Sequence, residues 1–307
     1  MTNRIDVLGL GAVAVDFVGT LRNWPAKGAK KPLQSLSIYD GGLVGTAVTA
    51  VARLGGSVRF AGKLGNSDMA RRAIEALEKE GVDTSFVIRA ENAEPVIAFV
   101  YIDSADGQRN VFWTRQNVQY PFSSEFPDKN WFDNTAVVLI DHEAGMAGVE
   151  TAKVAAQHCI PVVVDVEQNE PHVRQLFTFS SHIVVSEDFA ADYTGKTDVQ
   201  QMLEALKISP DQTIIITCGK NGCAGLAADG LFELPAFKVD VLDTTGCGDV
   251  FHGAYALAIA RGQTAIEAAH FASAAAALCA TKVGGRDGIP TVHKLHSFIQ
   301  NQVSHGG

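Results

Sequence analysis

Two aspartates six residues apart flank a glycine-rich loop in the stretch D-T-T-G-C-G-D-V-F-H-G-A, which begins at Asp243. The residues after Asp249 are typical of a helix, whose first turn leaves backbone N–H groups unpaired and carries partial positive charge. Gly246 and Gly248 allow the backbone to turn sharply and to come close to a ligand. Together these features predict a pocket for a phosphate group.

Asp249, in the first turn of this predicted helix, has two interpretations. A carboxylate there stabilises the helix through its dipole, and that role alone would explain the residue. A second anion beside a phosphate pocket is otherwise unfavourable unless it takes part in the chemistry. Such a carboxylate can take the proton from an attacking hydroxyl while the loop neutralises charge on the transferred phosphoryl group.

The elements that position this loop are predicted from hydrophobic patterns. Short, almost continuously apolar runs are typical of parallel strands covered on both faces, and they alternate with helical patterns. We therefore expect an α/β fold with a doubly wound, mostly parallel sheet and helices on both faces. The expected strands are 5–10, 58–65, 137–141, 161–166, 182–187 and 213–219, and the expected helices are 43–56, 69–81, 250–261, 265–281 and 293–303.

A second group of β-rich segments is predicted to form a small lid. These segments lie at about 12–20, 33–39 and 96–115, and the last contains the hairpin signal S-A-D-G at 104–107. We expect one domain over 1–307 with the lid strands interleaved in the sequence. Exposed lid edges favour a partner strand, so a homodimer through the lid is expected.

The composition limits the class of protein. The 307 residues are 47% hydrophobic and 19% charged, which is globular, and a net charge of -9 argues against a general nucleic-acid binder. The five cysteines are odd in number and form no C-x-x-C pair, which argues against a disulfide scaffold and a zinc site. The apolar stretches are shorter than the roughly 20 residues of a membrane span. We expect a soluble cytoplasmic protein without nucleic-acid or membrane partners.

Three motifs together resemble the ribokinase-like (PfkB) carbohydrate kinases. The stretch from Asp243 resembles the C-terminal signature of that family, and G-G-L-V-G-T-A-V-T-A-V-A-R-L-G-G at 41–56 resembles its N-terminal signature. The segment T-C-G-K-N-G at 217–222 is similar to its nucleotide loop. The resemblance covers 5–290 and implies a ribokinase-like fold, a sugar substrate, and ATP with Mg²⁺ as cofactors.

The resemblance also implies a role for each matching residue. Asp249 falls on the catalytic base, and Gly246, Cys247 and Gly248 fall on the backbone anion hole, where cysteine replaces the usual alanine. The remaining positions fall into three groups: substrate contacts at Asp16, Lys30, Gly41, Gly42, Thr46 and Glu143; the ATP side at Ser186, Thr217, Gly219 and Gly222; and metals at Asp243 and Thr245 for a monovalent cation such as K⁺ and at Glu187 for Mg²⁺ through water.

Three positions depart from the family pattern. Thr46 stands where asparagine is usual, with shorter reach toward a sugar. Ser186 and Phe189 occupy the two polar positions of an N-x-x-E motif that is linked to Mg²⁺, so that Glu187 or Asp188 would have to substitute. Ala14 removes a further polar contact.

The sequence predicts the class of the sugar substrate, with several alternatives. The G-G-R-D-G-I-P segment at 284–290 and the C-terminal signature look most similar to the ketohexokinase and sulfofructose-kinase branch. Lys30 could meet an acidic group, whereas Glu143 would repel an anion and accept hydrogen bonds from neutral hydroxyls. We expect a neutral ketose or pentose, such as fructose or ribose. Acidic sugars (sulfofructose, 2-keto-3-deoxygluconate) and nucleosides are the alternatives.

Parts of the sequence also match two other classes of protein. G-L-G-A-V-A at 9–14 matches the G-x-G-x-x-A dinucleotide fingerprint, but that motif needs a following helix and an acid about 20 residues on. Here a β-rich segment follows, and Asp16 is too close. A non-catalytic sugar or nucleotide sensor is the other class; Asp249 argues against it, and the altered segment at 186–189 favours it. His252, one turn after Asp249, is expected on a half-exposed helix face.

Overall fold

The body of the protein is a nine-stranded sheet in the order β13-β12-β11-β10-β9-β8-β1-β4-β5. The computed structural model describes residues 4–105 and 108–305. Seven strands run parallel, and β12 and β13 form an antiparallel extension at one edge. The strands are β1 Ile5–Leu10, β4 Val58–Leu64, β5 Asp83–Arg89, β8 Thr135–Asp141, β9 Val162–Val166, β10 His182–Ser186, β11 Thr213–Thr217, β12 Cys223–Ala227 and β13 Gly230–Leu234.

Helices cover both faces of this sheet because the side chains of its strands alternate between two apolar cores. Val137 and Leu139 of β8 face the core under α1, α2, α7 and α8, while Val138 and Ile140 face the core under α3 to α6. The helices are α1 Leu43–Arg53, α2 Asp68–Lys79, α3 Gly145–Gln157, α4 Val173–Thr178, α5 Glu187–Thr194, α6 Val199–Leu206, α7 Cys247–Ala260, α8 Ala265–Cys279 and α9 Val292–His305.

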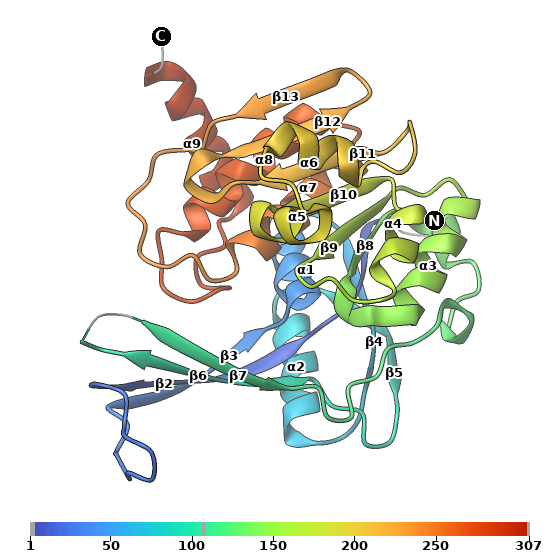
Figure 1. Cartoon of the computed structure of the whole chain (residues 1–307). Helices are drawn as coiled ribbons and strands as arrows, with labels where there is room; N and C mark the ends of the chain where they lie inside the picture. Colours follow the sequence, from blue (N-terminus) through green and yellow to red (C-terminus); the bar gives the residue numbers. More distant parts are fainter. Residues whose placement is uncertain (1–3, 106–107, 306–307) are drawn as a thin grey trace.

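A second sheet of four strands projects from the body (Figure 1). Its order is β3-β2-β6-β7, with β2 and β6 parallel and the outer pairs antiparallel. The strands are β2 Ala14–Leu21, β3 Ser35–Gly41, β6 Val96–Asp103 and β7 Arg109–Thr114. We call this sheet the lid sheet. The turn expected between β6 and β7 includes residues 106 and 107, which lie outside the described residues.

The position of the site follows from the topology. From β1 the sheet grows in one direction through β4 and β5, and in the other through β8 to β13. Ligands of such folds bind at the carboxyl ends of the strands where the order reverses, here between β1 and β8. Helix α7 packs against β1, β8 and β9, so its first turn lies near that point.

The α/β class with a doubly wound sheet is confirmed, and so is the small second sheet. Sequence patterns missed β5 and the β12–β13 hairpin, although Asp229-Gly230 is a D-G turn signal. The expectation for His252 was wrong, because it is buried rather than half-exposed. None of the helices in 4–105 and 108–305 has the length and apolar character to cross a membrane.

Candidate active site

A cavity of about 300 Å³ lies between the lid sheet and the body. Its walls come from the lid strands β2 and β3, the helices α1 and α2, the first turn of α7 and the loop before α9. It brings together seven of the predicted site residues: Asp16, Gly41, Gly42, Thr46, Thr245, Gly246 and Asp249. These residues are up to 233 positions apart in the sequence (16 to 249), and the fold places them around one space.

The loop before α7 is shaped by two glycines with different needs. Gly246 has φ 74°, and a Cβ there would stand 2.8 Å from the Cα of Gly285, so both its conformation and its packing require glycine. A Cβ at Gly248 would meet no described atom within 4 Å. The backbone at Gly248 is therefore open on this side, and the missing side chain allows a ligand to approach it closely.

The backbone N–H groups at the start of α7 have no side-chain cap among the described residues. The N–H of Cys247 donates to the Thr244 carbonyl at 3.2 Å, and that of Val250 donates to Gly246 at 2.9 Å. The N–H groups between them, at Gly248 and Asp249, belong to the unpaired first turn of the helix. This end of α7 is suited to bind an anion.

Asp249 lies half-buried at the base of the cavity. Burial raises the pKa of its carboxyl group well above the ordinary value, and the carboxylates of Asp165 and Glu167 raise it further. Arg286 acts in the opposite direction. A carboxylate with a raised pKa is a stronger base once it is ionised, which suits proton removal from a hydroxyl.

Asp16, on the lid strand β2, faces the same cavity. Burial raises the pKa of its carboxyl group to about 6, Arg286 lowers it and Asp40 raises it. A Cβ at Gly41 would stand 2.4 Å from Asp16 Oδ2, so this glycine makes room for the carboxylate. The ionised carboxylate can accept hydrogen bonds from hydroxyl groups in the cavity.

The entry to α1 is fixed by Asp141, a residue that sequence reasoning did not select. Its buried carboxylate at the end of β8 accepts the N–H of Ala12 at 2.7 Å and that of Val44 at 3.3 Å. Burial raises the pKa of this carboxyl group to about 7. A Cβ at Gly11 would stand 2.3 Å from that carboxyl group, and β2 follows at once. The G-x-G-x-x-A motif therefore serves packing here, and no helix opens after it.

Glu143 and Lys30, predicted to contact substrate, do not line the cavity. Strand β8 ends at Asp141, and Glu143 lies in the short helix η3 (His142–Ala144). Its Oε1 is 2.6 Å from Arg115 Nη2, and Arg115 also pairs with Glu170 at 2.9 Å. Arg115 is shared between Glu143 and Glu170, so it offsets only part of the charge with which Glu143 would repel an anionic substrate. Lys30 is exposed in the loop between β2 and β3.

The residues predicted for the ATP side lie together at the carboxyl ends of β10 and β11, where Ser186 pairs with Thr217 in register. Ser186 Oγ accepts the N–H of Phe189 at 3.2 Å and so caps α5, which places Glu187 in its first turn. Gly219 is the first residue of the short helix η4 (Gly219–Asn221) and Gly222 follows its end; a Cβ at Gly222 would stand 2.0 Å from the Leu234 carbonyl oxygen.

His252 and Asp165 join these two parts of the site. The His252 ring lies 2.8 Å from the Gly248 carbonyl through Nδ1 and 2.9 Å from the Val184 carbonyl of β10 through Nε2. Asp165 Oδ2, buried at β9, is 3.3 Å from the same Nδ1. The burial of His252 was not predicted from the sequence, because α7 is covered on several sides by α1, α8 and the sheet.

The two predicted ligands of a monovalent cation bond to each other. Asp243 Oδ1 accepts from the N–H of Thr245 at 2.9 Å and from its hydroxyl at 2.7 Å, and Oδ2 accepts the N–H of Gly284 at 2.9 Å. These donors, followed by Arg109, lower the pKa of Asp243 against the effect of burial. The guanidinium of Arg109, from the lid strand β7, contacts the Thr245 hydroxyl. A cation here would meet an ionised carboxylate and compete with Arg109.

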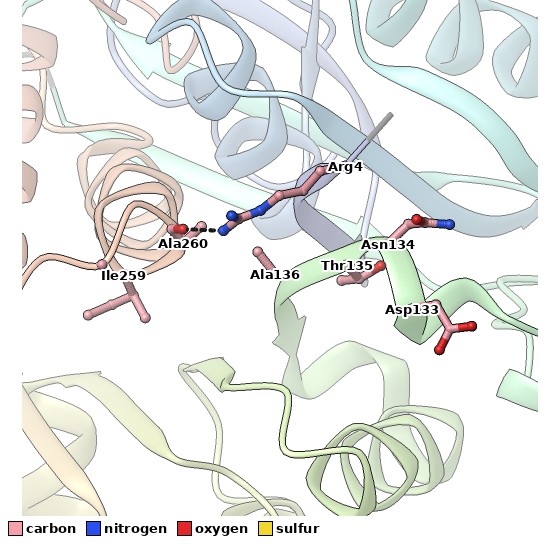
Figure 2. A pocket seen from close by; sticks show the side chains of 8 residues that line it. Arg4, Asp133, Asn134, Thr135, Ala136, Ile259 and Ala260 are labelled. Carbon is pink, nitrogen blue, oxygen red and sulfur yellow. Dashed lines mark hydrogen bonds between the residues drawn. The ribbon is translucent and has the colours of Figure 1, made fainter. Parts of the chain in front are cut away.

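A second surface hollow lies away from this site. Figure 2 shows this hollow of about 310 Å³ at the opposite end of α7, where Arg4 Nη2 donates to the Ala260 carbonyl at 2.7 Å. A cation at a helix C-terminus is stabilising in itself. This contact explains Arg4 without a ligand.

Comparisons with known proteins place the chain in a family. Residues 4–292 match the family model described as pfkB family carbohydrate kinase. The chain is 26% identical to the ribokinase of Bacillus subtilis over 96% of its length and 99% of the relative's, and 26% identical to fructokinase-2 of Zea mays over 84% of each. It superimposes on the Arabidopsis thaliana ribokinase complexed with ribose and ATP with a TM-score of 0.86, at 21% identity, covering 97% and 99% of the two chains.

Proposed function

The chain belongs to the pfkB family of carbohydrate kinases, and from this premise we propose that it transfers the γ-phosphoryl group of ATP to a hydroxyl of a neutral ketose or pentose, similar to fructose or ribose. One observation carries the proposal: Asp249, at the anion-binding end of α7, faces the same cavity as Asp16 of the lid sheet. A proton acceptor, phosphate-binding N–H groups and a partner for hydroxyls then surround one space.

Asp249 takes the proton from the attacking hydroxyl in this mechanism. Its raised pKa makes the ionised form a strong base, and the cationic Arg286 in the same cavity keeps that form accessible. Asp16 orients the sugar by accepting hydrogen bonds from its hydroxyl groups. Gly41, Gly42 and Thr46 complete the wall against the sugar.

The phosphoryl group is held where the loop Gly246–Gly248 enters α7, by backbone N–H groups such as that of Gly248, so the cysteine side chain at 247 in place of alanine leaves this function intact. The ATP lies toward the carboxyl ends of β10 and β11, near Ser186 and Thr217. Glu187 would hold Mg²⁺ through water, and Asp243 with Thr245 would hold K⁺; the metal charge offsets that of the phosphates.

A neutral sugar is favoured by the charges around the cavity. The acids outnumber the bases, also after the Arg53–Glu80 pair at 2.6 Å removes one of each and Arg72 pairs with Asp40 at 2.9 Å. A sulfonate or carboxylate on the substrate would add to this negative charge. The lining acids are Asp16, Asp40, Glu80, Asp249 and Asp287, and the lining bases are Arg53, Lys79 and Arg286.

Several narrower expectations remain predictions. They are the ketohexokinase and sulfofructose-kinase branch, the single domain over 1–307, the homodimer through the lid sheet and the cytoplasmic location. The substrate contacts of Lys30 and Glu143 also remain predictions, since neither residue belongs to the cavity wall.

The test is ADP release from MgATP with a panel of acceptors. The panel contains fructose, ribose, glucose, sulfofructose, fructose 6-phosphate, 2-keto-3-deoxygluconate and adenosine, each with wild type and Asp249→Asn. We expect turnover with one neutral sugar and a fall in kcat of about 10²- to 10⁴-fold in the variant, the usual effect of losing a positioned base. ATP binding by the variant, measured by calorimetry, should stay unchanged.

The outcomes separate the alternatives. Wild-type turnover by Asp249→Asn would exclude this mechanism. Turnover with an acidic sugar or with adenosine alone would replace the substrate class while keeping the reaction. Sugar and nucleotide binding without turnover of any acceptor would indicate the sensor.

A further inference from the structure

Arg286 belongs to the segment G-G-R-D-G-I-P between α8 and α9, and the fold places its side chain in the wall of the cavity. Its backbone carbonyl accepts a hydrogen bond from Arg53 of α1. Its Nη2 donates to the Gly41 carbonyl at 2.7 Å, at the end of the lid strand β3. Arg286 is thus held at its backbone by helix α1 of the body and at its guanidinium by strand β3 of the lid sheet.

Helix α1 leaves space for this guanidinium. A Cβ at Gly45 would stand 2.6 Å from Arg286 Nη2. Glycine inside a helix is destabilising relative to alanine by roughly 0.5–1 kcal/mol. Helix α1 accepts this loss of stability in the turn that the Arg286 guanidinium contacts.

The guanidinium has more donors than partners. It carries five N–H groups, and its buried Nε has no hydrogen-bond partner among the described residues. Burial lowers the pKa of Arg286 to about 10, and Asp40, Asp16 and Asp249 raise it, so the side chain is cationic at neutral pH. Because this cationic side chain lines the cavity and keeps donors that no described residue uses, it is suited to bind a ligand that supplies an acceptor.

The cavity also needs a donor of this kind. Carboxylates such as Asp16 and Asp249 recognise the O–H groups of a sugar but cannot recognise its lone pairs. A sugar oxygen between a carboxylate and a guanidinium can donate to one and accept from the other. Among the other basic residues of the wall, Arg53 is already bonded to Glu80 and to the Arg286 carbonyl.

We propose that Arg286 is a substrate-binding residue that donates a hydrogen bond to one oxygen of the sugar held between Asp16 and Asp249, and so selects sugars that have an oxygen at that position. This inference rests on the proposed kinase function and adds a contact to it. It assigns to the G-G-R-D-G-I-P segment a direct role in choosing the substrate.

The experiment measures kcat/KM for Arg286→Lys and Arg286→Gln with D-fructose, D-ribose and the monodeoxy derivative of each at every carbon. Wild type should lose about 10- to 100-fold at the deoxy position that removes the oxygen bound by Arg286, the size expected for a hydrogen bond to a charged group. In Arg286→Gln the parent sugar should lose a similar factor, and the same deoxy sugar should lose almost nothing more. A purely structural role would lower all sugars equally.

Two further variants serve as controls. Arg261→Lys changes an arginine that also donates to a glycine carbonyl, Gly55 at 2.9 Å, but lies outside the cavity, so its deoxy-sugar profile should match wild type. Gly45→Ala should displace the guanidinium and reproduce part of the Arg286→Gln profile. Combined with Arg286→Gln, it should add little, because both changes act on one contact.

Failure of this inference is distinguishable from failure of the proposed function. Suppose that wild type phosphorylates a sugar, and that Arg286→Gln shows a normal thermal melting transition and keeps the wild-type profile of rates with the deoxy sugars. Arg286 then does not bind substrate, and the kinase assignment stands. If wild type phosphorylates no sugar of the panel, the proposed function fails, and the inference fails with it. Should Arg286→Gln not fold, Arg286→Lys and Gly45→Ala carry the same comparison.

Discussion

Asp249 and Asp16 share one cavity, and its burial affects the ionisation of both. The pKa of Asp16 is raised to about 6 and that of Asp249 is raised well above its ordinary value, with burial the largest cause in each. Both groups act as acceptors in the proposed reaction, so both must be ionised. The chemistry of these two residues therefore depends on pH in the range where ordinary carboxyl groups do not titrate.

We predict that kcat/KM for the sugar falls as the pH is lowered through the raised pKa values, with a midpoint at or above pH 6 rather than near 4. The cause is protonation of the free enzyme, which this parameter reports. Because Arg286 lowers the pKa of both carboxyl groups, Arg286→Gln should move the acid limb to higher pH. The check is a pH profile of initial rates in buffers of constant ionic strength. An acid limb that stays near pH 4 would contradict the prediction.

At the scale of elements, the site depends on how helix α7 begins. Gly246 takes a positive φ and approaches the backbone of Gly285, whereas Gly248 faces open space. The two glycines are two residues apart, yet one is required by the protein and the other by its expected ligand. Substituting each in turn separates stability from function.

We predict that Gly246→Ala lowers the free energy of unfolding by about 1–3 kcal/mol, because alanine is strained at positive φ and its methyl group meets Gly285. Gly248→Ala should leave stability within about 0.5 kcal/mol, the usual range for a change that meets no packing, while lowering kcat at least tenfold because the methyl group stands where the phosphoryl group binds. Urea unfolding and initial rates on the same preparations give both readings. Equal stability of the two variants would contradict the packing argument.

The sequence revealed the local parts of this site but not the contacts made over long distances. The loop around Gly246 and the entry to α1 are short signatures whose chemistry lies within a few residues. Arg286 reaches Gly41 across 245 positions, and Asp141 binds Val44 across 97. No periodicity reports such contacts, because burial of a charged side chain depends on elements that meet only in the fold.

At the scale of the whole molecule, the lid sheet has two different faces. Cross-strand partners share a face, so Phe99 and Phe112 lie on one side, with Phe17 and Ile38 in the same row. Asp16 lies on the opposite side, which it shares with Trp113. Phe99 is 43% exposed and Phe112 51% exposed, so the part of this row on β6 and β7 is an uncovered apolar surface.

We predict that this apolar row is the contact of a homodimer. Phe112→Asp should give a monomer in sedimentation velocity at a concentration where wild type is a dimer, because a buried unpaired carboxylate is unfavourable in an apolar interface. The control is Val111→Asp, an exposed residue on the opposite face of the same strand, which should sediment as wild type. A monomeric wild type at micromolar concentration would contradict the prediction.

The distribution of the three tryptophans gives the chain a built-in optical reporter. Trp24 and Trp113, 51% and 53% exposed, belong to the lid region, whereas Trp131 is 3% exposed in the body. A drier environment shifts indole emission to the blue, so Trp131→Phe would leave a signal that comes from the lid region alone. The emission of that variant during titration with sugar or nucleotide would follow lid movement. Its emission over a range of protein concentrations would follow subunit association, without any attached dye.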